Sequence, residues 1–237
     1  MAGHSKWHNI RHHKAIVDRK RGGMFTKLAR EITMAAKLGD ANPDYNPRLR
    51  LAIFNARKNS MPNDNIKRAM DRAADKNTEN YMPARYEGYG PGNVPIIVEC
   101  LTDNPRRTAP EMRSAFSKNG GALGAENSVS FMFTRAGQIY YAPNAGDADT
   151  VLETAIEAGA SDAESSEHGH IISTAPDDFM AVAKTLSDRL GEPERAELTW
   201  IPNNPIAIDD ATRTALDKLV DALHDNDDVQ NVITGAG

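Results

Sequence analysis

Positively charged side chains are concentrated at the start of the chain. The first thirty residues hold eight lysines and arginines and a single acid, Asp18. Such side chains neutralise phosphate groups and release condensed counterions, which supplies affinity for nucleic acid without selecting a sequence. We therefore predict phosphate contacts here, with a merely solvated basic surface as the alternative. The eight residues are Lys6, Arg11, Lys14, Arg19, Lys20, Arg21, Lys27 and Arg30.

An aromatic ring and four histidines lie within the same segment. Trp7 has two interpretations, stacking on an unpaired base or anchoring the segment to a hydrophobic core. The spacing of His4, His8 and His12 would align three rings on a helix. No cysteine or paired carboxylate completes a metal site there, so we predict no metal. We expect His12 and His13 to hydrogen-bond to phosphate or RNA instead.

A second group of cations stands at the start of a predicted helix. Asn104 and Pro105 form an N-cap and first-turn signal, and Arg106 and Arg107 follow directly. Backbone N–H groups at a helix N-terminus, together with two guanidinium groups, favour an anion. The alternative is ordinary capping, with Asp103 paired to an arginine.

The sequence lacks the patterns that mark common enzymes. Three glycines in 86–92 precede a predicted strand instead of linking a strand to a helix, so we interpret this stretch as a turn and not as a phosphate loop. Ser5 lacks the glycine spacing of a nucleophile elbow, and no His-Glu-x-x-His pattern occurs. The single cysteine, Cys100, excludes an internal disulfide and a multi-thiolate metal site. We predict neither catalysis nor a cofactor.

Charge is divided unevenly along the chain. Residues 1–80 carry 17 Lys and Arg and 8 Asp and Glu, a net charge of +9, whereas residues 81–237 carry 11 and 25, a net charge of −14. The overall net charge of −5 averages these two regions. Such asymmetry is typical of a protein with an anionic partner. Because the Debye length at physiological salt is about 8 Å, we expect the basic region to bind phosphate independently of the acidic one.

The basic region shows the periodicity of short helices. Apolar residues recur at helical spacing over 25–36, while Lys27, Arg30 and Lys37 fall on the opposite side, within about 80° of one another at about 100° per residue. We expect the apolar side to pack and the basic side to meet solvent. Asparagine and proline start signals predict two further helices before residue 80. The prediction is a bundle of three or four helices.

From residue 81 onward strands and helices alternate. Between residues 134 and 204 the predicted order is strand, helix, strand, strand, helix, strand, which is typical of a ferredoxin-like unit. Ahead of this unit we predict a turn over 86–92, a strand over 94–101, a helix over 105–118 and a strand over 128–133.

The last predicted helix, 209–224, and strand, 228–233, cannot bury both of their faces alone. They complete the unit that is left open at residue 133. We therefore predict an α+β protein in which a helical bundle precedes two ferredoxin-like α/β domains, one inserted in the other. The predicted domains are 1–80, the discontinuous pair 81–133 plus 205–237, and the inserted 134–204.

Separated motifs in a fixed order give the chain a family resemblance. They include Gly3-His-Ser-Lys-Trp-His-Asn-Ile10, Asn59-Ser-Met-Pro-Asn-Asp-Asn-Ile-Lys-Arg-Ala69, Tyr86-Glu-Gly-Tyr-Gly-Pro-Gly92, Leu101-Thr-Asp-Asn-Pro-Arg-Arg-Thr108 and Gly120-Gly-Ala-Leu-Gly124. Together these resemble the YebC/PmpR family, bacterial relatives of the mitochondrial translational activator of cytochrome oxidase. Ser60 stands where the family more often has asparagine.

The resemblance covers essentially the whole chain and implies a helical N-terminal domain followed by two α/β domains. It also implies a regulatory role associated with nucleic acid, transcriptional for many members and translational or ribosome-associated for others.

These patterns predict a nucleic-acid-binding regulatory protein that is not an enzyme. The first hypothesis is a transcriptional regulator that binds the backbone of duplex DNA. The alternative is a translation factor that binds RNA or the ribosome, favoured by the basic segment with Trp7 and by the lack of an evident helix-turn-helix or dimer seam. No apolar run is long enough to span a membrane. We expect a monomer in the reducing cytoplasm, without a membrane partner.

Overall fold

Three helices open the part of the chain that the structure describes. The computed structural model describes residues 21–75 and 80–237. The helices are α2 (Arg21–Leu38), α3 (Pro47–Lys58) and α4 (Asn63–Ala73). They share one core, to which α2 contributes Ile32, α3 contributes Leu49 and Ile53, and α4 contributes Ile66. The predicted helical region is confirmed.

The buried Asn46 fixes the connection between α2 and α3. Its side-chain oxygen accepts a hydrogen bond from the backbone N–H of Leu49 at 3.0 Å, which caps α3. Its amide nitrogen donates to the carbonyls of Ala35 and Asp40, each at 2.7 Å. One side chain therefore holds the start of α3 against the end of α2.

Four residues, 59–62, join α3 to α4. The backbone N–H of Met61 donates to Ala56 and that of Ser60 donates to Arg57, both at 2.9 Å. These two bonds form a Schellman motif, in which the residue after the C-cap adopts a left-handed conformation. That residue is Ser60, with φ of 60°. Met61 then enters the helical core.

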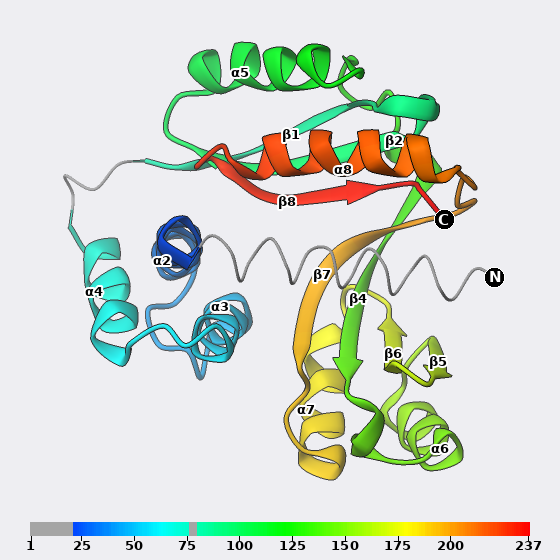
Figure 1. Ribbon diagram of the computed structural model, residues 1–237. Coiled ribbons are helices and arrows are strands. Elements are labelled where there is room, and N and C mark those ends of the chain that lie inside the picture. Colours follow the sequence, from blue (N-terminus) through cyan, green and yellow to red (C-terminus); the bar gives the residue numbers. More distant parts are fainter. Residues whose placement is uncertain (1–20, 76–79) are drawn as a thin grey trace.

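The first sheet combines strands from the middle and the end of the chain. Its order is β3-β1-β2-β8, and its neighbours are antiparallel. Figure 1 shows helices α5 and α8 side by side over this sheet. The strands are β1 (Met82–Tyr89), β2 (Pro95–Thr102), β3 (Ala122–Leu123) and β8 (Val229–Thr234), and the helices are α5 (Pro105–Lys118) and α8 (Asp210–His224).

The second sheet has the order β5-β6-β4-β7 and is also antiparallel. Its elements follow one another as βαββαβ, which confirms the predicted ferredoxin-like order. They are β4 (Phe133–Tyr141), α6 (Ala148–Ala158), β5 (Asp162–Ser166), β6 (Gly169–Thr174), α7 (Phe179–Leu190) and β7 (Arg195–Pro202).

The chain therefore contains a helical region and two α/β domains, as predicted. In Figure 1 the long strands β4 and β7 run from the level of the first sheet down into the second, and the three-helix region lies to one side of both. The limits predicted for each domain, 1–80, 81–133 plus 205–237, and 134–204, stay a prediction. A helix long and apolar enough to cross a membrane does not occur among residues 21–75 and 80–237.

Two local predictions need correction. The turn predicted over 86–92 is right only for its second half, where Pro91–Asn93 form a 3-10 turn with Gly92 at φ of 70°. Residues 86–89 belong to β1, where a Cβ at Gly88 would lie 2.4 Å from the Ala122 carbonyl oxygen of β3. The strand predicted over 128–133 is irregular chain with a short 3-10 helix. There the buried Glu87 carboxylate accepts the backbone N–H groups of Val129 and Ser130, at 2.9 and 2.8 Å, which removes them from strand pairing.

Replacing Ser60 by glycine is expected to raise the free energy of unfolding by about 0.5–1 kcal/mol, because glycine adopts a positive φ without steric cost. Urea unfolding followed by circular dichroism measures the change. Ser60→Val is the control and should be less stable than the wild type. A glycine variant no more stable than the wild type would contradict a strained turn at this position.

Candidate nucleic-acid interface

The C-terminal part of the chain covers the basic side of α2. Arg30 donates from Nη1 to the backbone carbonyls of Leu101 at 3.1 Å and Asp227 at 2.6 Å. The same nitrogen lies 3.1 Å from the carboxylate of Asp228. The guanidinium also stands 4.3 Å from the centre of the Tyr81 ring. With its side chain only 10% exposed, Arg30 is part of an internal contact.

Lys27 and Lys37 are also engaged within the chain. Lys27 donates from Nζ to the carbonyl of His224 at 2.7 Å, at the end of α8. Lys37 donates to the Asn80 side chain at 2.6 Å. The prediction that this side of α2 meets solvent is therefore wrong for Lys27 and Arg30, because residues 224–228 pack over it.

The Asp228 carboxylate is the centre of this contact, and its side chain is 4% exposed. It accepts hydrogen bonds from Arg30 at 3.1 Å, Arg107 at 2.8 Å and Thr108 at 2.7 Å. Burial by itself raises the pKa of this carboxyl, but hydrogen bonds from Thr108, Arg107 and Thr102 outweigh burial and lower the pKa of Asp228 below its usual value. Asp228 is thus held as an anion.

The N-terminus of α5 already has an anion from this chain. Asn104 caps the helix by accepting from the backbone N–H of Arg107. The Arg107 side chain donates to Asp103 and to Asp228, at 2.8 Å each. The capping alternative therefore describes Arg107, whose side chain is 45% exposed but paired with two carboxylates. Arg106 is also exposed and forms no ion pair with a described residue. An external phosphate at Arg107 would compete with both carboxylates.

Most of the predicted nucleic-acid-binding residues near the start of the chain lie outside the described residues. The side chain of Arg21, the first residue of α2, also lies outside them. Contact between these side chains and nucleic acid stays a prediction. The others are Lys6, Trp7, Arg11, His12, His13, Lys14, Arg19 and Lys20.

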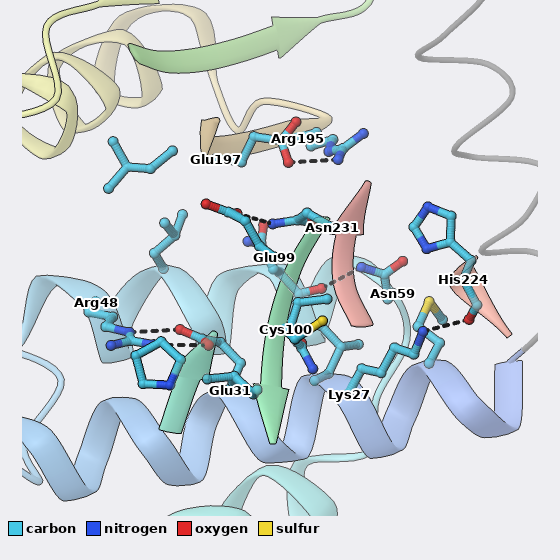
Figure 2. A pocket seen from close by; sticks show the side chains of 18 of the residues that line it. Lys27, Glu31, Arg48, Asn59, Glu99, Cys100, Arg195, Glu197, His224 and Asn231 are labelled. Atoms are coloured by element: carbon cyan, nitrogen blue, oxygen red, sulfur yellow. Dashed lines mark hydrogen bonds and ion pairs between the residues drawn. The ribbon is translucent and has the colours of Figure 1, made fainter. Parts of the chain in front are cut away.

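A cleft of about 1220 Å³ separates the helical region from the two sheets. Six lysines and arginines and seven acidic residues line it. Figure 2 shows two ion pairs in this lining, Arg48 with Glu31 at 2.8 Å and Arg195 with Glu197 at 2.6 Å. Arg135 also pairs with Glu99, at 2.7 Å. Because its own acids compensate these cations, the cleft does not favour a polyanion.

Trp200 connects the two sheets at the wall of this cleft. Its indole N–H donates to Glu99 at 3.0 Å, so β7 is tied to β2. The guanidinium groups of Arg85 and Arg135 each lie 5.2 Å from the centre of its ring. Glu99 also accepts from Asn231 of β8 at 3.1 Å. This cluster holds the two sheets together and was not identified from the sequence.

Cys100 also lines the cleft, but its thiol has low reactivity. The residue is 2% exposed. Burial raises the pKa of its thiol to about 12, so the reactive thiolate is scarce at neutral pH.

Two family models together match nearly the whole chain. The model described as the TACO1/YebC protein N-terminal domain matches residues 5–76. The model described as the TACO1/YebC second and third domain matches residues 81–236. The chain belongs to the TACO1/YebC family. The resemblance drawn from the sequence motifs is confirmed.

One solved structure of similar fold is a conserved hypothetical protein, Aq1575, from Aquifex aeolicus. It is 43% identical to this TACO1/YebC chain and superposes with a TM-score of 0.85. The match covers 93% of this chain and 92% of the other.

Exposed cations of this TACO1/YebC protein remain on α3, α4 and α5. None of them forms an ion pair with a residue that the structure describes. Apart from Arg106, they were not singled out from the sequence. The helical pattern of the sequence could have indicated the exposed cations of α4, because its buried positions lie on one side of the helix and its cations lie on the other. The residues are Arg50, Arg57, Lys67, Arg68, Arg106, Arg113 and Lys118.

Replacing Asp228 by asparagine is expected to lower the free energy of unfolding at pH 7 by about 3 kcal/mol, because Arg30 loses its buried counter-charge. The pKa of Asp228 is lower when folded, so its ionisation stabilises the fold above the ordinary aspartate pKa of about 4. That stabilisation is lost as the pH falls through the lower, folded pKa.

Urea unfolding of the wild type and Asp228→Asn at pH 7 and pH 3 measures this dependence. The difference between the two proteins should shrink at the lower pH. Asp188→Asn, which removes an exposed ion pair with Lys184, is the control with a small effect. An equal difference at both pH values would contradict the role of ionised Asp228.

Proposed function

We propose that the protein is a nucleic-acid-binding regulator and that duplex DNA is its target. The exposed cations of α3 and α4 supply phosphate contacts, together with those predicted in residues 1–20. The family model that matches residues 81–236 is named for transcriptional regulation, which supports a role in transcription. The cations that remain outside internal ion pairs support the mode of binding, because backbone contact requires available charge.

The arrangement of α3 and α4, a helix-turn-helix that was not evident from the sequence, supports the choice of DNA. Two helices joined by a turn of three or four residues form the unit that places a recognition helix in the major groove. Here residues 59–62 form the connection, and α4 is the second helix. Its exposed residues include Asn63 near the N-terminus, followed by Lys67 and Arg68. Figure 1 places α4 at the outer edge of the molecule, away from both sheets, where a duplex has access to it.

A second candidate function is binding to RNA or the ribosome in translation. Both family models carry the name TACO1, which is the mitochondrial translational activator of cytochrome oxidase. In addition, α5 presents a separate basic surface: Arg106 and Arg113 are exposed and seven residues apart, about 10 Å along one side of the helix. Two basic surfaces on different domains suit a large folded RNA better than one short duplex.

The double variant Lys67→Ala/Arg68→Ala is expected to weaken binding to random duplex DNA. If both side chains contact phosphates, the slope of log K against log salt should become shallower by about 1.8. Fluorescence anisotropy across a salt series measures this slope. Lys184→Ala/Lys218→Ala removes the same charge from α7 and α8 and is expected to leave the slope unchanged. An unchanged slope in the α4 variant would exclude these residues from the interface.

Sedimentation with ribosomal particles decides between the two candidates. For a DNA-binding regulator we expect the protein to leave the particles at the salt concentration that also removes it from duplex DNA. Stoichiometric association that survives higher salt would reject DNA as the target and favour the second candidate. The α5 variant Arg106→Ala/Arg113→Ala would then be expected to weaken association with the particles.

A further inference from the structure

Helix α6 exposes two large apolar side chains that the fold does not use. Leu152 is 43% exposed and Ile156 is 65% exposed. They are four residues apart, so they form one ridge along the helix together with the exposed Ala148 one turn earlier. The inner side of α6 is separate, because Val151 and Ala155 are buried in the core of the second sheet. The ridge therefore remains available for a partner.

A row of acidic residues runs beside this ridge. Asp149, Glu153 and Glu157 each follow a ridge residue by one position, so they are also four residues apart. Glu157 pairs with Arg189 of α7. Asp149 and Glu153 are exposed and form no ion pair with any residue in 21–75 or 80–237. The outer side of α6 thus presents parallel apolar and acidic rows.

The position of α6 separates these rows from the rest of the charged surface. Figure 1 shows α6 at the lower end of the second sheet, far from α4 and on the side opposite the first sheet. Nucleic acid and anionic lipid are both repelled by the acidic row, since they carry negative charge. An occupant of this surface needs positive charge next to apolar side chains.

We propose that the outer side of α6, defined by Ala148, Leu152 and Ile156 with Asp149 and Glu153, binds a basic amphipathic helix of another protein. A helix with apolar residues at i and i+4 and lysine or arginine beside them matches both rows. Burial of Leu152 and Ile156 supplies affinity, and the carboxylates orient the partner and speed its approach. The surface is small, so the complex is transient. This proposal goes beyond the nucleic-acid function and does not depend on it.

A synthetic peptide tests the proposal with the full-length protein. The peptide is an 18-residue helix with leucines at i and i+4 on one side and lysines beside them, and its control has glutamates in place of the lysines. Amide chemical shifts of the ¹⁵N-labelled protein are followed during titration. We expect saturable shifts concentrated in residues 148–158 with the lysine peptide, and at least tenfold weaker binding of the glutamate peptide.

Substitutions on α6 provide the decisive comparison. Leu152→Ser/Ile156→Ser should weaken binding at least tenfold while leaving the fold intact, since both side chains are exposed. Asp149→Asn/Glu153→Gln should weaken it less and remove most of its salt dependence. Leu38→Ser is the matched control, because Leu38 is 63% exposed at the end of α2 and should not affect binding.

Several outcomes would overturn the proposal. These are shifts centred outside α6, equal binding of the two peptides, and absence of shifts at about 1 mM peptide. Shifts in α6 that depend on protein concentration without peptide would also overturn it, because the occupant would then be a second copy of this chain.

Discussion

A buried negative charge ties an arginine of α2 and an arginine of α5 into the fold. The Asp228 carboxylate, 4% exposed, can remain ionised only because Arg30, Arg107 and Thr108 donate to it. Through this group α2, α5 and the turn before β8 meet at one point. Arg30 and Arg107, both predicted from the sequence as phosphate contacts, are therefore engaged with this carboxylate, although Arg107 stays 45% exposed. Exposed cations without an ion pair to a described residue lie instead on α3, α4 and α5.

The second constraint is the link between the two sheets. Glu99 accepts hydrogen bonds from Trp200 and Asn231 and pairs with Arg135, so one carboxylate joins strands of both sheets. The ion pairs on the walls of the cleft neutralise its cations with acids of the same chain, so these cations are not available to an external anion. The outer surfaces of the helices carry the remaining exposed groups. Cations are exposed on α4 and α5, beside the exposed Asp64 and Asp71 of α4, whereas α6 exposes apolar and acidic side chains.

Much of this fold could be predicted from the sequence because its signals are local. Helical spacing indicated the core of α2 to α4, and Asn46 indicated the start of α3. The order of elements indicated the ferredoxin-like unit. The environment of Arg30 could not be predicted, because its partner Asp228 is 198 residues away in the sequence. Gly88 was predicted to lie in a turn for a similar reason. The chain that requires a glycine there is β3, which is distant in the sequence.

The coupling free energy between Arg30 and Asp228 is the most direct measure of how strongly the buried Asp228 carboxylate holds Arg30 in the fold. A double-mutant cycle of Arg30→Ala and Asp228→Asn, measured by urea unfolding at pH 7, separates their interaction from the effects of each residue alone. We expect a coupling free energy of about 1–3 kcal/mol, with the affinity of Arg30→Ala for duplex DNA close to that of the wild type. Additive effects on stability, combined with a large loss of DNA affinity in Arg30→Ala, would contradict a structural role for Arg30.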